Sequence, residues 1–149
     1  IAGLFVSSGV AIGDTYYIHA WTLGSSSNSR TDIDLTNTCG NETATVKLKF
    51  WYLDGTLMTN QSMYLYGATT STVTSDSNGE VTFALAPKNR VRVNLTYALI
   101  SGTQKGHARI TTNYEEPGTK CLVGGYAIST VNGSNYGFSS YHINNGNRF

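Results

Sequence analysis

Residues 43–53, with the sequence TATVKLKFWYL, decide the fold class of this chain. Apolar and polar side chains alternate along the segment, which is the pattern of a β-strand with one buried face and one solvated face. Trp51 falls on the polar face, where a large aromatic side chain indicates a ligand platform or a protein interface. The inward positions are Ala44, Val46, Leu48, Phe50 and Tyr52, and the outward positions are Thr45, Lys47, Lys49 and Trp51.

Similar strand-like segments lie on both sides, separated by turn signals about every eight to twelve residues, and no segment has a helical period. This pattern predicts an all-β fold, an antiparallel β-sandwich of the immunoglobulin-like or jelly-roll-like kind. Asp54 and Gly55 predict a tight hairpin, so we expect the next strand, residues 57–66, to be the antiparallel neighbour of residues 43–53. The other expected strands cover residues 15–23, 31–37, 81–85, 90–99, 106–112 and 120–128.

The length and charge of the chain exclude several classes of protein. Its 149 residues suit one domain. We expect a sandwich domain at residues 14–131, preceded by an apolar N-terminal extension, residues 1–13, and followed by an Asn/Gly-rich tail or edge strand, residues 132–149. The net charge of +1 supplies no field that would attract nucleic acid. No apolar run is long enough to span a membrane.

The N-terminal extension is too apolar to be left in water. It lacks the basic start of an intact signal peptide, and its start at Ile1 suits a mature secreted chain whose leader has been removed. We expect it either to complete the sheet of a neighbouring subunit by strand addition or to pair within its own domain as a first strand. The side chains expected to make the assembly contact are Ile1, Leu4, Phe5, Val6, Val10 and Ile12.

The two cysteines, Cys39 and Cys121, are far apart in the sequence and do not have a metal-binding spacing. We expect them to form one disulfide, with two buried free thiols as the alternative. A disulfide favours an oxidising compartment, and hence a secreted or cell-surface protein. Four sequons make Asn41, Asn60, Asn94 and Asn132 candidates for glycosylation, although a chain this rich in Asn, Ser and Thr has about as many by chance.

Five short stretches of the chain follow one another in a familiar order. They are Trp21-Thr22, LTNT at residues 35–38, ATVKLKFWYLDG at 44–55, GEVTFALAP at 79–87 and KGHARI at 105–110. In this order they resemble the small β-sandwich modules of bacterial and archaeal surface and secreted proteins. The resemblance covers about residues 16–128 and implies a sandwich fold and an extracellular location. It supplies no catalytic residue, because its motifs mark the ends of strands.

No arrangement of residues in the sequence predicts catalysis, a metal or a cofactor. A G-x-S-x-G nucleophile elbow is absent, and the three histidines lie on separate segments. Asp32 and Asp34 share one strand face, where paired carboxylates would suit glycoside hydrolysis or Ca²⁺ binding, or would simply keep the face wet.

Six outward-facing basic residues are expected to form a ribbon across neighbouring strands. Such a ribbon would hold an acidic polysaccharide or the carboxylates of another subunit, or would keep the β-surface soluble. The six residues are Lys47, Lys49, Arg90, Arg92, His107 and Arg109.

These observations favour a structural or binding role over catalysis. The first expectation is a structural subunit of an extracellular, self-assembling filament, pilus-like fibre or surface array, whose partners are copies of the same chain. The alternative is an adhesin or carbohydrate-binding module with a polysaccharide ligand, in which Trp51 is the stacking residue. A hydrolase with an unrecognised site is the third interpretation.

Overall fold

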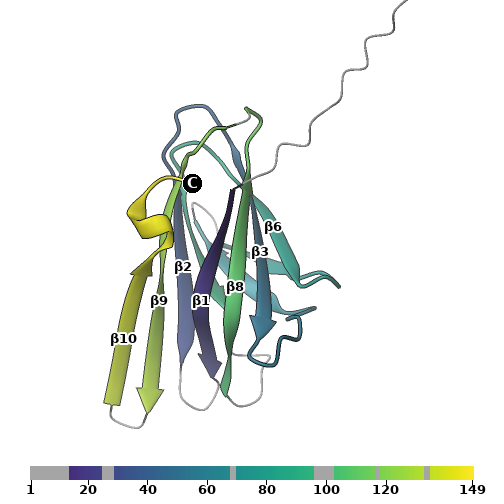
Figure 1. The fold of residues 1–149 in the computed structure, drawn as a ribbon, viewed down its shortest axis with the longest axis vertical. Helices are drawn as coiled ribbons and strands as arrows, with labels where there is room; N and C mark the ends of the chain where they lie inside the picture. The colour runs from purple at the N-terminus through teal and green to yellow at the C-terminus, as the bar shows by residue number, and fades with distance from the viewer. Residues whose placement is uncertain (1–13, 25–28, 68–69, 96–102, 117, 133–134) are drawn as a thin grey trace, which may run out of the picture.

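The computed structural model describes residues 14–24, 29–67, 70–95, 103–116, 118–132 and 135–149. These residues form ten β-strands and one short 3-10 helix, and the strands lie in two antiparallel sheets (Figure 1). The all-β sandwich predicted from the sequence is therefore confirmed. The elements are β1 (Asp14–Gly24), β2 (Arg30–Asn37), β3 (Ala44–Tyr52), β4 (Ser62–Tyr66), β5 (Thr70–Thr74), β6 (Glu80–Leu85), β7 (Arg90–Leu95), β8 (Thr103–Asn113), β9 (Leu122–Asn132), β10 (Asn135–His142) and the helix η1 (Ile143–Gly146).

The strand order is that of a jelly roll. The four-stranded sheet has the order β1-β8-β3-β6, and the six-stranded sheet has the order β10-β9-β2-β7-β4-β5. The first eight strands therefore form four nested antiparallel pairs, β4 with β5, β3 with β6, β2 with β7 and β1 with β8. Nested pairs shared between two sheets are the jelly-roll arrangement, which is one of the two sandwich types expected. Strands β9 and β10 extend the six-stranded sheet beyond β2.

The expectation that residues 43–53 and 57–66 are neighbours is wrong. The tight turn does form, because Thr56 donates its backbone N–H to the Asp54 carboxylate at 2.9 Å and Gly55 has a φ of +83°. After the single bridge from Trp51 to Leu57, however, the chain crosses to the other sheet. Strand β4 pairs there with β5 and β7 instead of with β3.

The core lies between the sheets, and Trp21 is one of its largest side chains. The Trp21 indole Nε1 donates to the backbone carbonyls of Trp51 and His107, at 3.1 Å each. Gly106 makes room for this contact, because a Cβ on Gly106 would lie 1.7 Å from the Trp51 carbonyl oxygen and 2.7 Å from the Trp21 ring. The two tryptophans thus have different places, since Trp21 is fully buried and Trp51 is not part of the core.

The predicted disulfide between Cys39 and Cys121 is confirmed. It joins the loop after β2 to the start of β9, and the two Cα atoms are 5.2 Å apart. Close to it, the buried side chain of Phe149 packs on Tyr16, and the Phe149 backbone exchanges two hydrogen bonds with Leu122. The last residues of the chain are therefore part of the sandwich, with β10 as an edge strand. The assembly segment, residues 1–13, lies outside the described residues.

Candidate functional site

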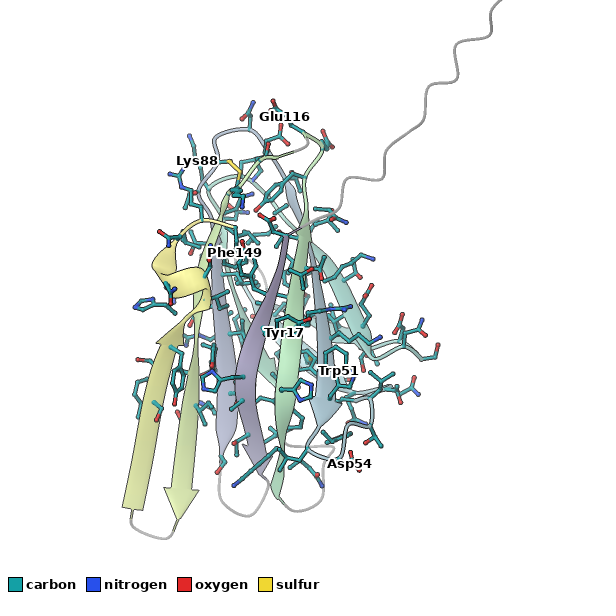
Figure 2. The ribbon with its side chains drawn as sticks, in the orientation of Figure 1. Tyr17, Trp51, Asp54, Lys88, Glu116 and Phe149 are labelled. Carbon is teal, nitrogen blue, oxygen red and sulfur yellow. A yellow bond between two sulfur atoms is a disulfide. The ribbon has the colours of Figure 1, made fainter. Side chains whose placement is uncertain are left out.

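The outer face of the four-stranded sheet gathers basic and aromatic side chains from three adjacent strands. Trp51 on β3 lies opposite His107 on β8, and one row further along Lys49 lies opposite Arg109. On the other side of β8, Arg109 lies opposite Tyr17 of β1. Figure 2 shows Tyr17 and Trp51 on this sheet. Antiparallel registry thus brings together residues that are up to about 90 positions apart in the chain.

Trp51 is the centre of this group. Its indole stacks on the His107 ring with centroids 5.2 Å apart and an interplanar angle of 5°. The Lys49 Nζ lies 5.6 Å from the indole centroid, and the Arg109 guanidinium carbon lies 5.7 Å from it. Both distances are within the range of a cation–π interaction. We call these four residues the Trp51 cluster.

The base of the Trp51 cluster is rigid. The backbone carbonyls of Trp51 and His107 both accept from the buried Trp21 indole, so the core holds the two stacked residues from below. Arg109 and Lys49 are register partners in the centre of the sheet. The core therefore fixes the backbone from which the side chains of the Trp51 cluster project.

The charges of the Trp51 cluster are not neutralised by ion pairs among the described residues. Lys47 pairs with Glu80 at 3.0 Å, whereas no carboxylate of the described residues lies within ion-pair distance of Lys49 or Arg109. The nearest turns contribute Asp54 and Asp76, which hydrogen bond to their own turns.

These turn hydrogen bonds lower the pKa of both carboxylates. The Thr56 hydroxyl and N–H hold the pKa of Asp54 below its usual value. The Glu80 N–H does the same for the pKa of Asp76, to which the charge of Lys49 adds a smaller effect. Both carboxylates therefore stay ionised at neutral pH, and Asp76 lies near enough to Lys49 for the two charges to interact.

A separate open groove of about 500 Å³ lies at the end of β3 and the start of β8, and no residue of the Trp51 cluster is among its described walls. It combines the exposed edge of an aromatic ring with amide, hydroxyl and ammonium groups. Its walls are made by Tyr52, Leu53, Asp54, Thr56, Gln104 and Lys105.

The basic ribbon expected from the sequence is split between the two sheets. Arg90 and Arg92 lie on β7 in the six-stranded sheet, where both bind Asp34, at 2.8 and 3.2 Å. The hydrogen bond to Asp34 raises the pKa of Arg92. Asp32, on the same strand as Asp34, binds Arg30 and the amide of Asn94. The expectation of one ribbon is wrong, because strand parity does not reveal which sheet a strand joins.

The four sequon asparagines lie in different settings. Asn41 and Asn60 are exposed in loops, and Asn60 has a left-handed φ of 55°. Asn94 is half-buried on β7, and its amide donates to Asp32. Asn132 ends β9. Loop positions such as Asn41 and Asn60 suit a bulky glycan better than Asn94 does.

The described residues contain neither a cluster of metal ligands nor a membrane-spanning helix. Within them, no three His, Cys, Asp or Glu side chains gather so that they could hold a metal ion. His19 and His142 lie together beside β10, whereas His107 belongs to the Trp51 cluster. The described part of the chain also has no helix that is long and apolar enough to cross a membrane.

Comparison with known proteins supports the fold. The crystal structure of Thermotoga maritima 1070 superposes on this chain with a TM-score of 0.54 at 11% sequence identity, over 88% of this chain and 92% of that chain. At such low identity the likeness extends to the fold alone. No family model and no curated protein matches the sequence.

Proposed function

We propose that this chain is an extracellular binding module that holds an acidic polysaccharide on the outer face of its four-stranded sheet. The observation that carries the proposal is the Trp51 cluster, in which a half-buried indole is flanked by Lys49 and Arg109, neither of which forms an ion pair among the described residues. The disulfide supports an oxidising compartment.

The chemistry of such a polymer fits the groups on this face. The C–H face of a sugar ring packs on an aromatic ring, as Trp51 offers here. A carboxylate or sulfate on the same sugar would take a charge-assisted hydrogen bond from Arg109, whose planar guanidinium binds such groups through two N–H donors. A flat strand surface suits an extended chain, whereas an enclosed small ligand requires a deep pocket.

The test is titration with polygalacturonate and dextran sulfate, with neutral dextran as the uncharged control. Binding is measured by tryptophan fluorescence, in which Trp51 is the accessible reporter because Trp21 is buried. We expect an acidic polymer to bind, and the affinity to fall as salt is added. Trp51→Ala and Arg109→Ala should each weaken binding about tenfold.

The matched control is Arg92→Ala, which removes an arginine from the opposite sheet. It should leave the affinity unchanged. The proposal is wrong if neither acidic polymer binds, or if the Arg92 and Arg109 variants lose affinity equally.

A second candidate function, a self-assembling structural subunit, is supported by a different observation. Strands β1 to β8 form a complete jelly roll without residues 1–13, so the described sandwich is closed without the apolar side chains of that segment. We propose that they add a strand to a neighbouring copy. Deletion of residues 1–12 should give a folded monomer that no longer polymerises. A deletion variant that cannot fold, or a full-length chain that is monomeric, contradicts this proposal.

A further inference from the structure

A second concave site lies where the six-stranded sheet extends beyond the four-stranded sheet. Strand β1 is the edge of the four-stranded sheet, whereas β9 and β10 continue the opposite sheet past it (Figure 1). The inner face of β10 is therefore not covered by another strand of the described residues. A groove of about 470 Å³ results between β1, β10 and η1. Its walls are made by Tyr17, His19, Tyr126, Ser140, Tyr141, His142 and Asn145.

The floor of this groove is built from aromatic rings. Tyr126 and Tyr141 are register partners on β9 and β10, and their rings stack with centroids 5.0 Å apart. The His19 ring stands edge-on against both, at 5.5 Å from Tyr126 and 4.6 Å from Tyr141. The Tyr126 hydroxyl also hydrogen bonds to His19, and Tyr126 itself is buried. The floor is thus fixed by packing and by a hydrogen bond.

Two tyrosines that line the groove expose their rings to solvent. Tyr17 is 68% exposed and Tyr141 is 39% exposed. Tyrosine offers a large amphipathic surface at a small cost in side-chain entropy, which is why it is frequent in binding sites. The exposed rings therefore offer contact area to a ligand in the groove.

The remaining wall is polar and uncharged. Ser140 offers a hydroxyl, Asn145 offers an amide, and His142 offers a ring nitrogen. In the described part of the chain, none of these three side chains makes a hydrogen bond, ion pair or ring contact. The seven lining residues include no carboxylate, ammonium or guanidinium group. The lining of the groove therefore differs from the Trp51 cluster, although Arg109 of that cluster lies opposite Tyr17 in the neighbouring strand.

We propose that this groove binds a neutral saccharide ring. The apolar C–H face of the sugar would pack on Tyr141 and Tyr17, and its hydroxyls would exchange hydrogen bonds with Ser140 and Asn145. Few ligand classes combine an apolar face with a rim of uncharged donors and acceptors, and this combination matches the lining. The inference goes beyond the acidic-polymer site, because it concerns a different ligand and a groove centred on β9, β10 and η1, which adjoins the outer face of the four-stranded sheet only at β1.

The test uses maltotetraose, cellotetraose and chitotetraose as probes, added to the full chain and followed by NMR of the backbone and aromatic resonances. We expect one of the three to shift the resonances of Tyr17, His19 and Tyr141. The inference is overturned if none of the probes binds at millimolar concentration, or if the shifts lie outside the groove.

Variants separate this site from other exposed tyrosines. Tyr141→Ala should weaken binding about tenfold. Tyr64→Ala is the matched control, because Tyr64 is 40% exposed on β4, on the outer face of the six-stranded sheet. Equal losses in the two variants would contradict the assignment. Should Tyr141→Ala fail to fold, Asn145→Ala tests the polar wall and should also lower the affinity.

A third variant separates the two proposals of ligand binding. Trp51→Ala should leave tetrasaccharide binding unchanged while it removes binding of the acidic polymer. Loss of both activities in Trp51→Ala would show a single site and would overturn the separate groove. Retention of both would instead contradict the role of the Trp51 cluster and leave the groove supported.

Discussion

The outer faces of the two sheets both carry basic residues, but these residues have different partners on each face. On the six-stranded sheet, Arg90 and Arg92 both bind Asp34. On the four-stranded sheet, Lys49 and Arg109 lie over the ring of Trp51. In each case the basic residues alternate with inward apolar residues along a strand. The difference comes from the cross-strand partners. Asp34 stands directly opposite Arg92, whereas Lys49 stands opposite Arg109 on one side and opposite Glu80, which pairs with Lys47, on the other.

The contrast distinguishes basic side chains that form ion pairs within the sheet from basic side chains that stay available to a ligand. A guanidinium that already binds a carboxylate has little left to offer a ligand, and exposed pairs of this kind add only a modest stability. A cation over an aromatic ring keeps its charge available to an anion. Under the proposed function, the pairing of the charges and not their number decides which face holds the polymer.

The largest expected effect is on the free energy of unfolding, and it comes from removing the disulfide. Replacing Cys39 and Cys121 together by alanine should lower the free energy of unfolding by about 4 kcal/mol, because the disulfide closes a loop with a sequence separation of 82 residues. Urea denaturation measures the loss. Binding by the fraction that remains folded should be unchanged, and a loss below about 1 kcal/mol would contradict the prediction.

A pair of glycine variants compares the interiors beneath the two faces. Gly106→Ala should destabilise by about 3 kcal/mol or more, because the new Cβ meets the Trp51 carbonyl at 1.7 Å and the Trp21 ring. Gly124→Ala should cost less, about 1–2 kcal/mol, since its Cβ meets the Asp34 carbonyl at 2.7 Å and the movable end of Leu35. Chemical denaturation of both variants checks the order, and the reverse order would refute it.

Removing the Asp34 carboxylate should turn the outer face of the six-stranded sheet into a weak anion-binding surface. Asp34→Asn leaves Arg90 and Arg92 without their ion-pair partner, so unfolding should become easier by about 1 kcal/mol. The same variant should gain weak affinity for dextran sulfate through the two freed arginines. Lys49→Gln is the comparison on the other sheet, and it should lose affinity with a stability change within about 0.5 kcal/mol. Titration with dextran sulfate measures the affinity of both variants, and chemical denaturation measures their stability.

The smallest expected effect concerns acid stability. The pKa of Asp76 is lowered from 3.8 in the folded chain, chiefly by the Glu80 N–H, so its ionised form stabilises the fold above that pH. This contribution is lost as the pH falls through the lowered pKa. Asp76→Ala should therefore melt at a lower temperature than the native chain at neutral pH, and the gap should narrow in strong acid. Thermal melts over a pH series measure it, and a gap independent of pH would argue against this origin.

Features that depend on one strand could be predicted from the sequence. The parity of residues 43–53 correctly places Phe50 inside and Trp51 outside, because successive side chains of a strand point to opposite faces. The disulfide was also predictable, since the chain has two cysteines without a metal-binding spacing.

Features that depend on which strands meet could not be predicted. Arg92 and Lys49 have the same local pattern, yet the crossings of the jelly roll send β7 and β3 to different sheets. Strand β5, residues 70–74, is almost entirely polar and exposed and gave no apolar alternation. The aromatic groove combines His19, Tyr126 and Tyr141, whose contact exists only because β9 and β10 extend past β1. A cluster of aromatic residues near the C-terminus was its only visible signal.

The position of β8 links ligand recognition to the order of folding. Strand β8 lies between β1 and β3 and supplies His107 and Arg109, although it follows β3 by some fifty residues. The nested pairs close progressively longer loops, so the pairing of β8 with β1 has the greatest entropic barrier and is expected to be late. Until β8 inserts, Trp51 has neither its stacking partner nor its guanidinium. A partly folded chain would thus have no Trp51 cluster, and capture on an acidic polymer would select the molecules that had completed folding.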